Sequence, residues 1–219
     1  IVVHMNYTFV VLGVILVVIL YILYKVFTEK KTELASYRKL GGSVNFSDLK
    51  NPGSGSYYIS IWLYVPNKLS GNTKIYEING GLTLTLKIDN SLTVSNDGGS
   101  NDLFTITDSF PLQRWTCVIL SVGGGVIDAY LDGKLVKSVK DAPPNPSASS
   151  TLTEGVQTNG TIYIAKFERI PKVIDAQTAY ETYMAGNGGN GLVQFLKRFG
   201  ISLTLTKDST DQSTLSFPP

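Results

Sequence analysis

A run of 20 residues near the start of this chain, Met5 to Tyr24, carries no charged side chain and consists mainly of valine, leucine and isoleucine. A helix that crosses the roughly 30 Å hydrocarbon core of a bilayer needs about 20 apolar residues. Lipid offers the backbone no hydrogen-bond partner, so a run of this kind has to be helical. We therefore predict a short tail and one transmembrane helix within residues 1–24, with membrane-spanning positions at Tyr7, Val11, Leu16, Leu20 and Tyr24.

Two other interpretations of this run are disfavoured. A cleaved signal peptide needs a basic start, an apolar region of about 7–15 residues and a small-residue cleavage site. Here only His4 precedes the run, the run is longer, and no such site follows it. A buried core helix is disfavoured because the segment is apolar on every side and stands at one end of the chain.

The residues after the run predict how the chain is oriented. Lys25, Lys30 and Lys31 follow it directly, and positive charge beside a membrane helix favours the cytosolic side. We therefore expect the rest of the chain to face the cytosol. Residues 25–42 are polar and compatible with a helix, so they predict a helical stalk that Gly41 and Gly42 end.

Residues 43–219 are numerous enough for one folded domain. Cys117 is the only cysteine, which excludes an intramolecular disulfide, agrees with a reducing compartment and is interpreted as an inert core thiol. The formal net charge is +2, from 19 basic and 17 acidic side chains, and this balance does not suggest a nucleic-acid groove.

Alternating apolar residues predict strands in this region. Ile59, Ile61, Leu63 and Val65 fall on one face of an extended segment, and residues 82–88 alternate leucine or isoleucine with threonine or lysine. The latter pattern predicts a half-buried strand with a wet outer face. Many short strands with little helix favour an all-β, antiparallel β-sandwich.

The remaining segments complete this expectation. Residues 142–155 are rich in proline and serine and predict a long loop. Asp175 is placed to cap a short helix that Gly186 ends, and residues 192–199 predict a second one, so short helices are expected near 175–199. Residues 201–206 predict a last strand.

The segment from Phe110 to Val139 resembles a signature of the laminin-G-like, or concanavalin A-like, jelly-roll superfamily. It has a tryptophan that starts a strand, a glycine-rich turn and a hairpin with the pattern Tyr-x-Asp-Gly-Lys, and an earlier strand carries a matching tryptophan. The matching positions are Trp62, Trp115, Tyr130, Asp132 and Gly133. The resemblance covers roughly residues 43–206 and implies a jelly-roll β-sandwich. It carries no activity by itself.

These signature residues are interpreted first as structural. Trp62, Trp115 and Tyr130 are expected to pack in the core or at its rim rather than form a platform for a sugar. Asp132 and Gly133 are expected to form a tight hairpin turn, because Asp-Gly between apolar runs suits the positive φ angles of a type I′ turn.

An N-terminal membrane helix followed by a domain without disulfides also resembles the membrane-associated minor capsid proteins of large icosahedral DNA viruses, such as chloroviruses. In such viruses an internal membrane lies beneath a protein shell. This resemblance implies a domain that faces the shell, with other capsid proteins and the lipid bilayer as its partners.

The sequence offers little for catalysis. Glycosidases of this fold use an E-x-D-x-x-E strand, and no such triplet occurs here. The only histidine is His4, so the domain has no Ser-His or Cys-His nucleophile pair and no His/Cys zinc site. Asp89, Asp97 and Asp102 are weak candidates for a calcium site, because they lie on expected loops, but turns also need such residues. No cofactor is expected.

The first hypothesis is therefore a non-enzymatic structural protein that tethers an internal membrane to an overlying protein shell. Its expected contact segments are residues 67–72, 96–102 and 142–155. The alternative is a membrane-anchored, lectin-like carbohydrate-binding module facing the other side, for which glycosylation at Asn45 or Asn159 would be evidence. A hydrolase is a third and weaker hypothesis.

Overall fold

The computed structural model describes residues 13–21, 32–96, 101–141, 146–156, 159–188, 202–207 and 210–216, the last two ranges for their backbone only. Residues 13–21 form a helix, which contains Leu16 and Leu20. Tyr7, Val11 and Tyr24 lie outside the described residues. Within the described ranges, no helix is both long enough and apolar enough to cross a membrane.

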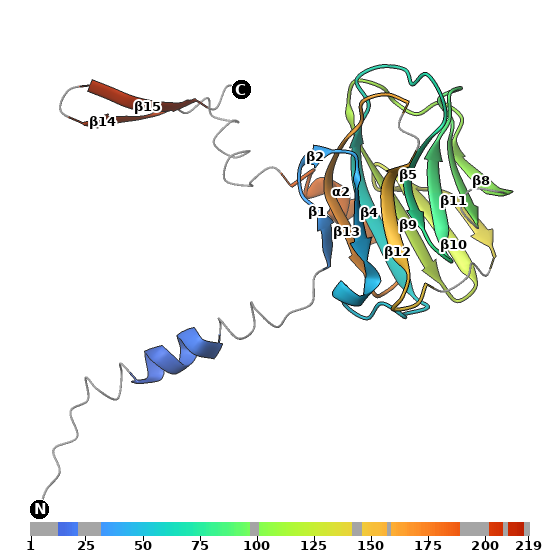
Figure 1. Ribbon diagram of the computed structural model, residues 1–219, viewed down its shortest axis with the longest axis horizontal. Helices are drawn as coiled ribbons and strands as arrows, with labels where there is room; N and C mark the ends of the chain where they lie inside the picture. The colour runs from blue at the N-terminus through green and yellow to red at the C-terminus, as the bar shows by residue number, and fades with distance from the viewer. Residues whose placement is uncertain are drawn as a thin grey trace, which may run out of the picture.

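Two antiparallel sheets pack face to face to form a β-sandwich (Figure 1). The larger sheet has the strand order β1-β13-β4-β9-β10-β11, and β2 also pairs with β13. Its strands are β1 (Glu33–Ala35), β2 (Arg38–Lys39), β4 (Tyr57–Tyr64), β9 (Trp115–Gly123), β10 (Val126–Leu131), β11 (Lys134–Lys140) and β13 (Tyr163–Ile170).

The smaller sheet has the strand order β3-β12-β5-β6-β7-β8. Its strands are β3 (Gly42–Asn45), β5 (Thr73–Ile78), β6 (Leu82–Leu86), β7 (Leu92–Asn96), β8 (Asn101–Thr107) and β12 (Thr151–Val156). A short 3-10 helix, η1 (Phe46–Asp48), follows β3. The chain crosses repeatedly between the sheets, so strands far apart in sequence become neighbours, as β4 and β9 do.

The main core fills the space between the sheets, as the alternating pattern predicts. Ile59, Ile61 and Leu63 of β4 point inward and are at most 2% exposed, and they face Leu84 and Val94 of the smaller sheet. Burying apolar side chains of this size contributes about 1.5–3 kcal/mol each relative to exposure. The antiparallel β-sandwich expected from the sequence is therefore confirmed, although the described chain is mostly β rather than all β because it also contains helices.

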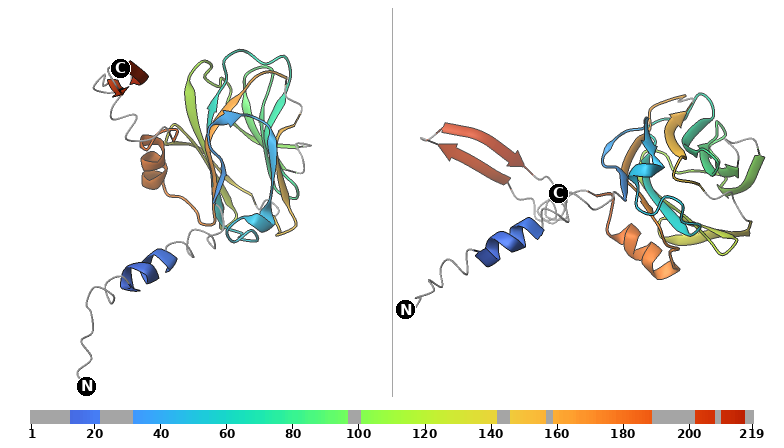
Figure 2. Two further views of the ribbon diagram at one scale, coloured as in Figure 1. Left: turned by 60° about the vertical axis from the view of Figure 1, so that its left-hand side comes forward. Right: turned by 60° about the horizontal axis from the view of Figure 1, so that its bottom comes forward.

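A second, smaller core lies on the outer face of the larger sheet. Helix α2 (Ala176–Met184) packs there, outside the sandwich (Figure 2), over Tyr58, Trp62 and Ile119. Asp175 caps this helix by accepting a hydrogen bond from the Thr178 N–H at 2.9 Å, as its position predicted. The larger sheet is consequently buried on both faces around β4 and β9.

The structure corrects the predicted helical stalk. Residues 25–42 were expected to be helical, but β1 begins at Glu33 and β2 ends at Lys39, so the folded domain begins about ten residues earlier than position 43. Leu34 and Ala35 pack against the core, and this burial favours strand pairing with β13 over an exposed polar helix. Residues 25–31 lie outside the described residues.

Three further expectations change. Residues 151–155 were assigned to a loop, but they belong to β12, which lies between β3 and β5. Ile88 lies beyond the end of β6 and is 50% exposed, whereas Thr83 on the supposedly wet outer face is fully buried. The last predicted strand is β14 (Ser202–Lys207), which pairs with β15 (Thr210–Ser216) and not with the sandwich. Residues 192–199 lie outside the described part of the chain.

Candidate functional site

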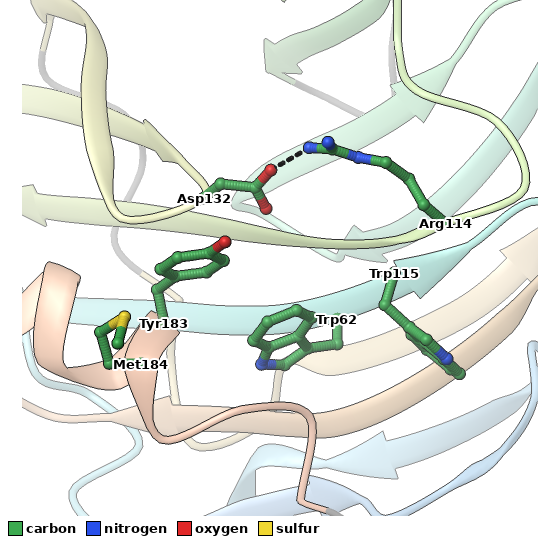
Figure 3. Close-up of a pocket in the computed structure, with 6 residues that line it drawn as sticks. All are labelled: Trp62, Arg114, Trp115, Asp132, Tyr183 and Met184. Carbon is green, nitrogen blue, oxygen red and sulfur yellow. Dashed lines mark hydrogen bonds and ion pairs between the residues drawn. The ribbon is translucent and has the colours of Figure 1, made fainter. Parts of the chain in front are cut away.

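A pocket of about 300 Å³ opens on the outer face of the larger sheet, beside the end of α2 (Figure 3). It combines aromatic walls with one pair of opposite charges. Four separate elements supply its lining: β4, the start of β9 with the residue before it, the β10–β11 turn, and α2. The lining residues are Trp62, Arg114, Trp115, Asp132, Tyr183 and Met184.

The charged pair lies across the mouth of this pocket. The Arg114 guanidinium donates to Oδ2 of Asp132, and Oδ1 of Asp132 accepts the backbone N–H of Cys117 at 2.9 Å. Asp132 is therefore held from two sides, with 18% of its side chain exposed, whereas 57% of the Arg114 side chain is exposed. The carboxylate is fixed in place and the guanidinium remains accessible.

The Asp132 carboxylate is positioned by the hairpin turn between β10 and β11. Asp132 and Gly133 have φ angles of +48° and +75°, as a type I′ turn requires. The predicted turn is therefore confirmed. The expectation that the pair is only a turn was incomplete, because this turn also aims the carboxylate of Asp132 at Arg114.

The floor of the pocket is a pair of aromatic rings. Trp62 stacks on Tyr183 of α2, with ring centroids 5.7 Å apart and an interplanar angle of 17°. Trp62 is 6% exposed, and its buried Nε1 has no hydrogen-bond partner among the described residues. Figure 3 shows the Tyr183 hydroxyl turned toward Asp132. Trp62 is thus mainly a packing residue, in agreement with the interpretation from the sequence.

Trp115 links the pocket to a neighbouring group of aromatic rings. Tyr37 lies 5.8 Å from Trp115 and stacks on Tyr163 at 6.3 Å with an interplanar angle of 8°. Tyr64 contacts both Trp115 at 5.5 Å and Tyr163 at 6.4 Å. We call these four residues the aromatic cluster. Tyr37 is 67% exposed and the other three residues are half-buried, so the cluster is open to water mainly at Tyr37.

Strand register places the aromatic cluster at one end of the larger sheet. Tyr64 pairs with both Tyr163 and Trp115 in the neighbouring strands. By contrast, the described chain enters this sheet at Glu33, which pairs with Glu168 of β13. The two levels are five residues apart along β13, or about 17 Å at the usual rise of a strand. Chain entry and aromatic cluster therefore lie toward opposite ends of the sheet.

The calcium candidates do not come together. The Asp89 carboxylate accepts the N–H and hydroxyl of Ser91, which lower its pKa, and Asp102 forms an ion pair with Lys87. Asp97 lies outside the described residues. Among the residues that the structure describes, no group of three potential metal ligands is present.

The remaining signature residues are structural. Tyr130 is 3% exposed and its hydroxyl donates to the Ile174 carbonyl oxygen at 3.4 Å, which ties the strand to the segment before α2. Cys117 is fully buried, and burial together with the Asp132 charge raises the pKa of its thiol to about 12. A thiol with this pKa is protonated at neutral pH and is a poor nucleophile.

Sequence reasoning missed Tyr37, Arg114 and Tyr183. Tyr37 lay in the expected stalk, Arg114 had no sequence neighbour of opposite charge, and Tyr183 was read only as part of a short helix. These three residues reach Trp115, Asp132 and Trp62 only because the chain returns between strands that are far apart in sequence. The one available signal was the dense aromatic content around Trp62, where Tyr57, Tyr58 and Tyr64 lie close in sequence.

Comparisons with known proteins agree with this fold. A family model described as the concanavalin A-like lectin/glucanases superfamily matches residues 39–165, which is more than half of the chain. The comparison with curated proteins finds no match for the sequence.

Several solved structures have a similar backbone. The binding domain of botulinum neurotoxin serotype D is 17% identical over 72% of this chain, with a TM-score of 0.54. Trypanosoma rangeli sialidase is 11% identical over 61% of the chain, with a TM-score of 0.51. The matched parts are 44% and 23% of those chains, so this chain spans less than half of their length. At these identities the likeness concerns the fold alone.

Proposed function

This chain belongs to the concanavalin A-like lectin/glucanases superfamily, and we propose that it serves as a non-enzymatic docking domain on a membrane anchor. In this proposal the apolar run from Met5 to Tyr24 lies in an internal membrane. The sandwich projects from its cytosolic side and binds an overlying protein shell, as in a minor capsid protein. The partners are therefore the bilayer and other structural proteins.

The exposed apolar helix supports the anchor. Every side chain from Val14 to Tyr21 is 47–65% exposed, so eight successive large apolar side chains lack a covering surface in the described part of the chain. Lipid would cover them. Because only residues 25–32 separate Tyr24 from β1, the sandwich would lie within about 30 Å of the membrane surface, the reach of eight extended residues.

The main support for the proposal is that the aromatic cluster lies far from the point where the chain enters the larger sheet. A tether needs one end at the membrane and a binding surface at the other. Glu33 enters beside Glu168, and the cluster around Tyr163 lies toward the other end of the same strand. Exposed tyrosine, tryptophan and arginine side chains are the residues enriched in the energetically important parts of protein interfaces.

The pocket supports a binding role over a hydrolytic one. Asp132 is the only carboxylate among its described lining residues, and it is engaged by Arg114 and by the Cys117 N–H. Hydrolysis by the usual glycosidase mechanism needs two carboxylates that flank the bond, one of them as an acid.

Cross-linking mass spectrometry on the native membrane or particle fraction tests this proposal. The chain offers exposed lysines at both ends of the larger sheet. Lys39 and Lys134 lie at the end with the aromatic cluster, whereas Lys50, Lys140 and Lys172 lie at the end where the chain enters. We expect links to shell proteins from Lys39 and Lys134, and fewer from the other three, which serve as the internal control.

Two results would contradict the proposal. If Lys50, Lys140 and Lys172 carried the links to the shell, the docking end would be wrong. If the only links were within the chain, with glycans attached at Asn45, the domain would face the opposite side of the membrane as a binding module. The Asn45 side chain is exposed and could carry a glycan, whereas Asn159 uses its side-chain amide to donate to the Asn72 carbonyl at 2.7 Å.

A further inference from the structure

We propose that the edge strand β11 binds an extended, acidic segment of another protein, which adds one strand to the larger sheet. This surface differs from the aromatic cluster, and the inference depends on neither the membrane anchor nor the shell. Its failure would leave docking through the aromatic cluster unaffected.

β11 forms an open edge of the larger sheet. Its seven residues, Lys134–Lys140, pair with β10 on one side, and no described strand pairs with them on the other. An edge strand presents a row of backbone N–H and C=O groups to which a further strand can bind. The strand at the opposite edge of this sheet, β1, has only three residues. β11 is therefore the place where the sheet offers the longer template for an added strand.

The side chains of β11 are open along almost its whole length. Six of its seven residues are exposed, and Val139 is half-buried. Leu135 and Val136 are 51% and 42% exposed, although both are apolar. Among the sandwich strands whose side chains the structure describes, only β11 leaves large apolar residues exposed. Apolar side chains of a bound strand would remove this surface from water.

The charge of β11 indicates the charge of its partner. The strand contains three lysines and no acidic residue. The side chains of Lys134, Lys137 and Lys140 form no ion pair or hydrogen bond with another residue that the structure describes. By contrast, Lys74 and Lys87 are each paired with a carboxylate. Unpaired positive charges along one exposed strand favour a partner strand that carries carboxylates.

The register with β10 shows where these carboxylates should lie. Lys137 lies opposite Ala129, and Lys134 lies opposite Leu131. Ala129 and Leu131 both pack in the main core, so the two lysines lie on the face of the sheet that turns toward this core. Leu135 lies on the other face. We therefore expect the partner strand to alternate acidic residues, beside the lysines, with apolar residues beside Leu135.

The same lysines disfavour a second copy of this chain as the partner. Two antiparallel β11 strands centred on Lys137 would place that residue opposite itself, and Lys134 opposite Lys140. Like charges directly opposite each other destabilise a strand pair. Lysines on edge strands commonly prevent pairing between identical chains in this way. β11 is thus protected against itself and open to a strand of opposite charge.

Polyanions other than proteins fit this edge less well. Phosphate groups of lipids or nucleic acids would attract the lysines, but they accept hydrogen bonds and donate none at neutral pH. The open edge presents both N–H donors and C=O acceptors. An extended peptide backbone supplies partners for both, as in other cases of strand addition.

The test uses the full chain in nanodiscs of neutral lipid. The probes are peptides of about ten residues, the upper end of usual strand lengths, in which glutamate alternates with valine, isoleucine or threonine. The same peptides with lysine in place of glutamate serve as controls. We expect binding of glutamate peptides only, with slower hydrogen exchange of the β11 amides in the complex. Charge attraction without strand pairing would not slow this exchange.

Two sets of variants separate the edge from the overall charge. Reversing Lys134, Lys137 and Lys140 to glutamate together should raise the dissociation constant by about tenfold or more. The matched control makes the same change in net charge at three exposed lysines elsewhere and should raise it by less than about threefold. These control substitutions are Lys50→Glu, Lys68→Glu and Lys172→Glu.

N-methylated peptides test the backbone pairing on the unaltered chain. Methyl groups on alternate peptide nitrogens block one hydrogen-bonding edge of an extended strand, and the opposite phase blocks the other edge. One phase should abolish binding and the other should preserve it. This comparison also carries the test if circular dichroism shows that the triple variant does not fold.

Several results would overturn the inference. Absence of binding to every glutamate peptide at up to about 1 mM would exclude the site. Equal losses in the two triple variants, or binding that survives methylation in both phases, would show attraction between charges without an added strand. Binding of phosphatidylserine vesicles or an oligonucleotide through these lysines, without peptide binding, would identify a different class of partner. Sedimentation that shows a dimer lost on charge reversal would make the partner a second copy.

Discussion

Arg169 is the largest side chain that the sandwich buries completely, with 1% of the residue exposed. Its guanidinium lies 5.1 Å from the ring centroid of Phe46 and 4.8 Å from that of Tyr57. The same group donates to the carbonyl oxygens of the loop at residues 50–52, at 3.2–3.3 Å. Burial raises the pKa of Tyr57 to about 12, against the opposing effect of the Arg169 charge, so the ring stays neutral beside it.

Replacing Arg169 with methionine should destabilise the domain by about 2–4 kcal/mol, because buried carbonyls lose charged donors and two cation–π contacts disappear. Lys87→Met removes an exposed ion pair and should cost less than about 1 kcal/mol. Urea denaturation of both variants measures the difference. Equal losses would show that Arg169 does not hold the loop at residues 50–52.

Glu154 is a second buried charge, and it responds to pH. Its side chain is fully buried and receives a hydrogen bond at 2.7 Å from Arg38, whose side chain is 34% exposed. Burial raises the pKa of Glu154 above its ordinary value near 4.5, although the Arg38 charge and hydrogen bonds from Arg38 and Gly41 oppose the shift. Burial also raises the pKa of Glu168, which pairs with Glu33 at the entry of the chain.

Raised pKa values make the folded state bind protons more tightly than the unfolded chain. The resulting stability is complete below the unfolded pKa near 4.5 and is lost as pH rises through the folded pKa of Glu154. Glu154→Gln should therefore flatten the decline in unfolding free energy above pH 4.5, leaving the contribution of Glu168. Denaturation midpoints at several pH values provide the measurement. Parallel pH profiles for wild type and variant would contradict this assignment.

At the scale of elements, the β10–β11 hairpin and α2 depend on one glycine. Gly133 has a φ of +75°, and a Cβ added there would lie 2.9 Å from Cα of Tyr180 and 3.0 Å from Cβ of Tyr183. The turn and the helix are therefore packed backbone to backbone at this point. Gly124, in the turn between β9 and β10, has a φ of +61° but meets nothing within 4 Å.

These two glycines form a matched pair. Gly124→Ala should cost about 1 kcal/mol, the strain of a side chain in the left-handed region. Gly133→Ala adds a clash with α2 and should cost about 1–3 kcal/mol more. Thermal and urea denaturation test the difference. Similar losses at both positions would mean that α2 moves away from the hairpin at little cost.

The aromatic cluster shows what element-level prediction can achieve. The alternating pattern placed Tyr64 on the outer face of β4, and the signature placed Trp115 at the start of a strand. Neither pattern could place Tyr37, which lies between β1 and β2, because strands of three and two residues are too short to show a periodicity. Its pairing with β13 depends on contacts about 130 positions away in sequence, such as that between Glu33 and Glu168.

At the scale of the whole molecule, the described helix at residues 13–21 contributes no side chain to the buried core of the folded domain. The buried core begins at Ala35, and none of the helical side chains from Val14 to Tyr21 is buried. The larger sheet carries both cores, one between the sheets and one beneath α2. The described contacts therefore place stability in the sandwich, and membrane attachment by the segment before it stays a proposal.

Deleting residues 5–24 should leave the unfolding free energy unchanged within about 0.5 kcal/mol, as for changes away from packed regions. The same deletion should move the protein from the membrane pellet to the supernatant after alkaline extraction. Fractionation and urea denaturation of the same samples measure both effects. Membrane association that survives the deletion would locate the attachment in the sandwich.

The sequence by itself determined the local features, since these depend on neighbours along the chain. Alternating apolar residues predicted the strands β4 and β6. The Asp132-Gly133 pair predicted the hairpin turn, and Asp175 predicted the start of α2. The antiparallel sandwich followed from the number of such strands. The uncharged run from Met5 to Tyr24 remains a prediction of a membrane helix.

Only the tertiary structure decided which distant residues meet. The local pattern predicted a helix at Glu33. The structure has a strand there, because strand pairing and the burial of Ala35 outweigh a weak helical preference. Arg114 and Asp132 become a pair because β9 and β10 are neighbours, and Tyr183 joins Trp62 because α2 folds back over the larger sheet. The pocket consists of these long-range contacts, and no stretch of sequence contains them.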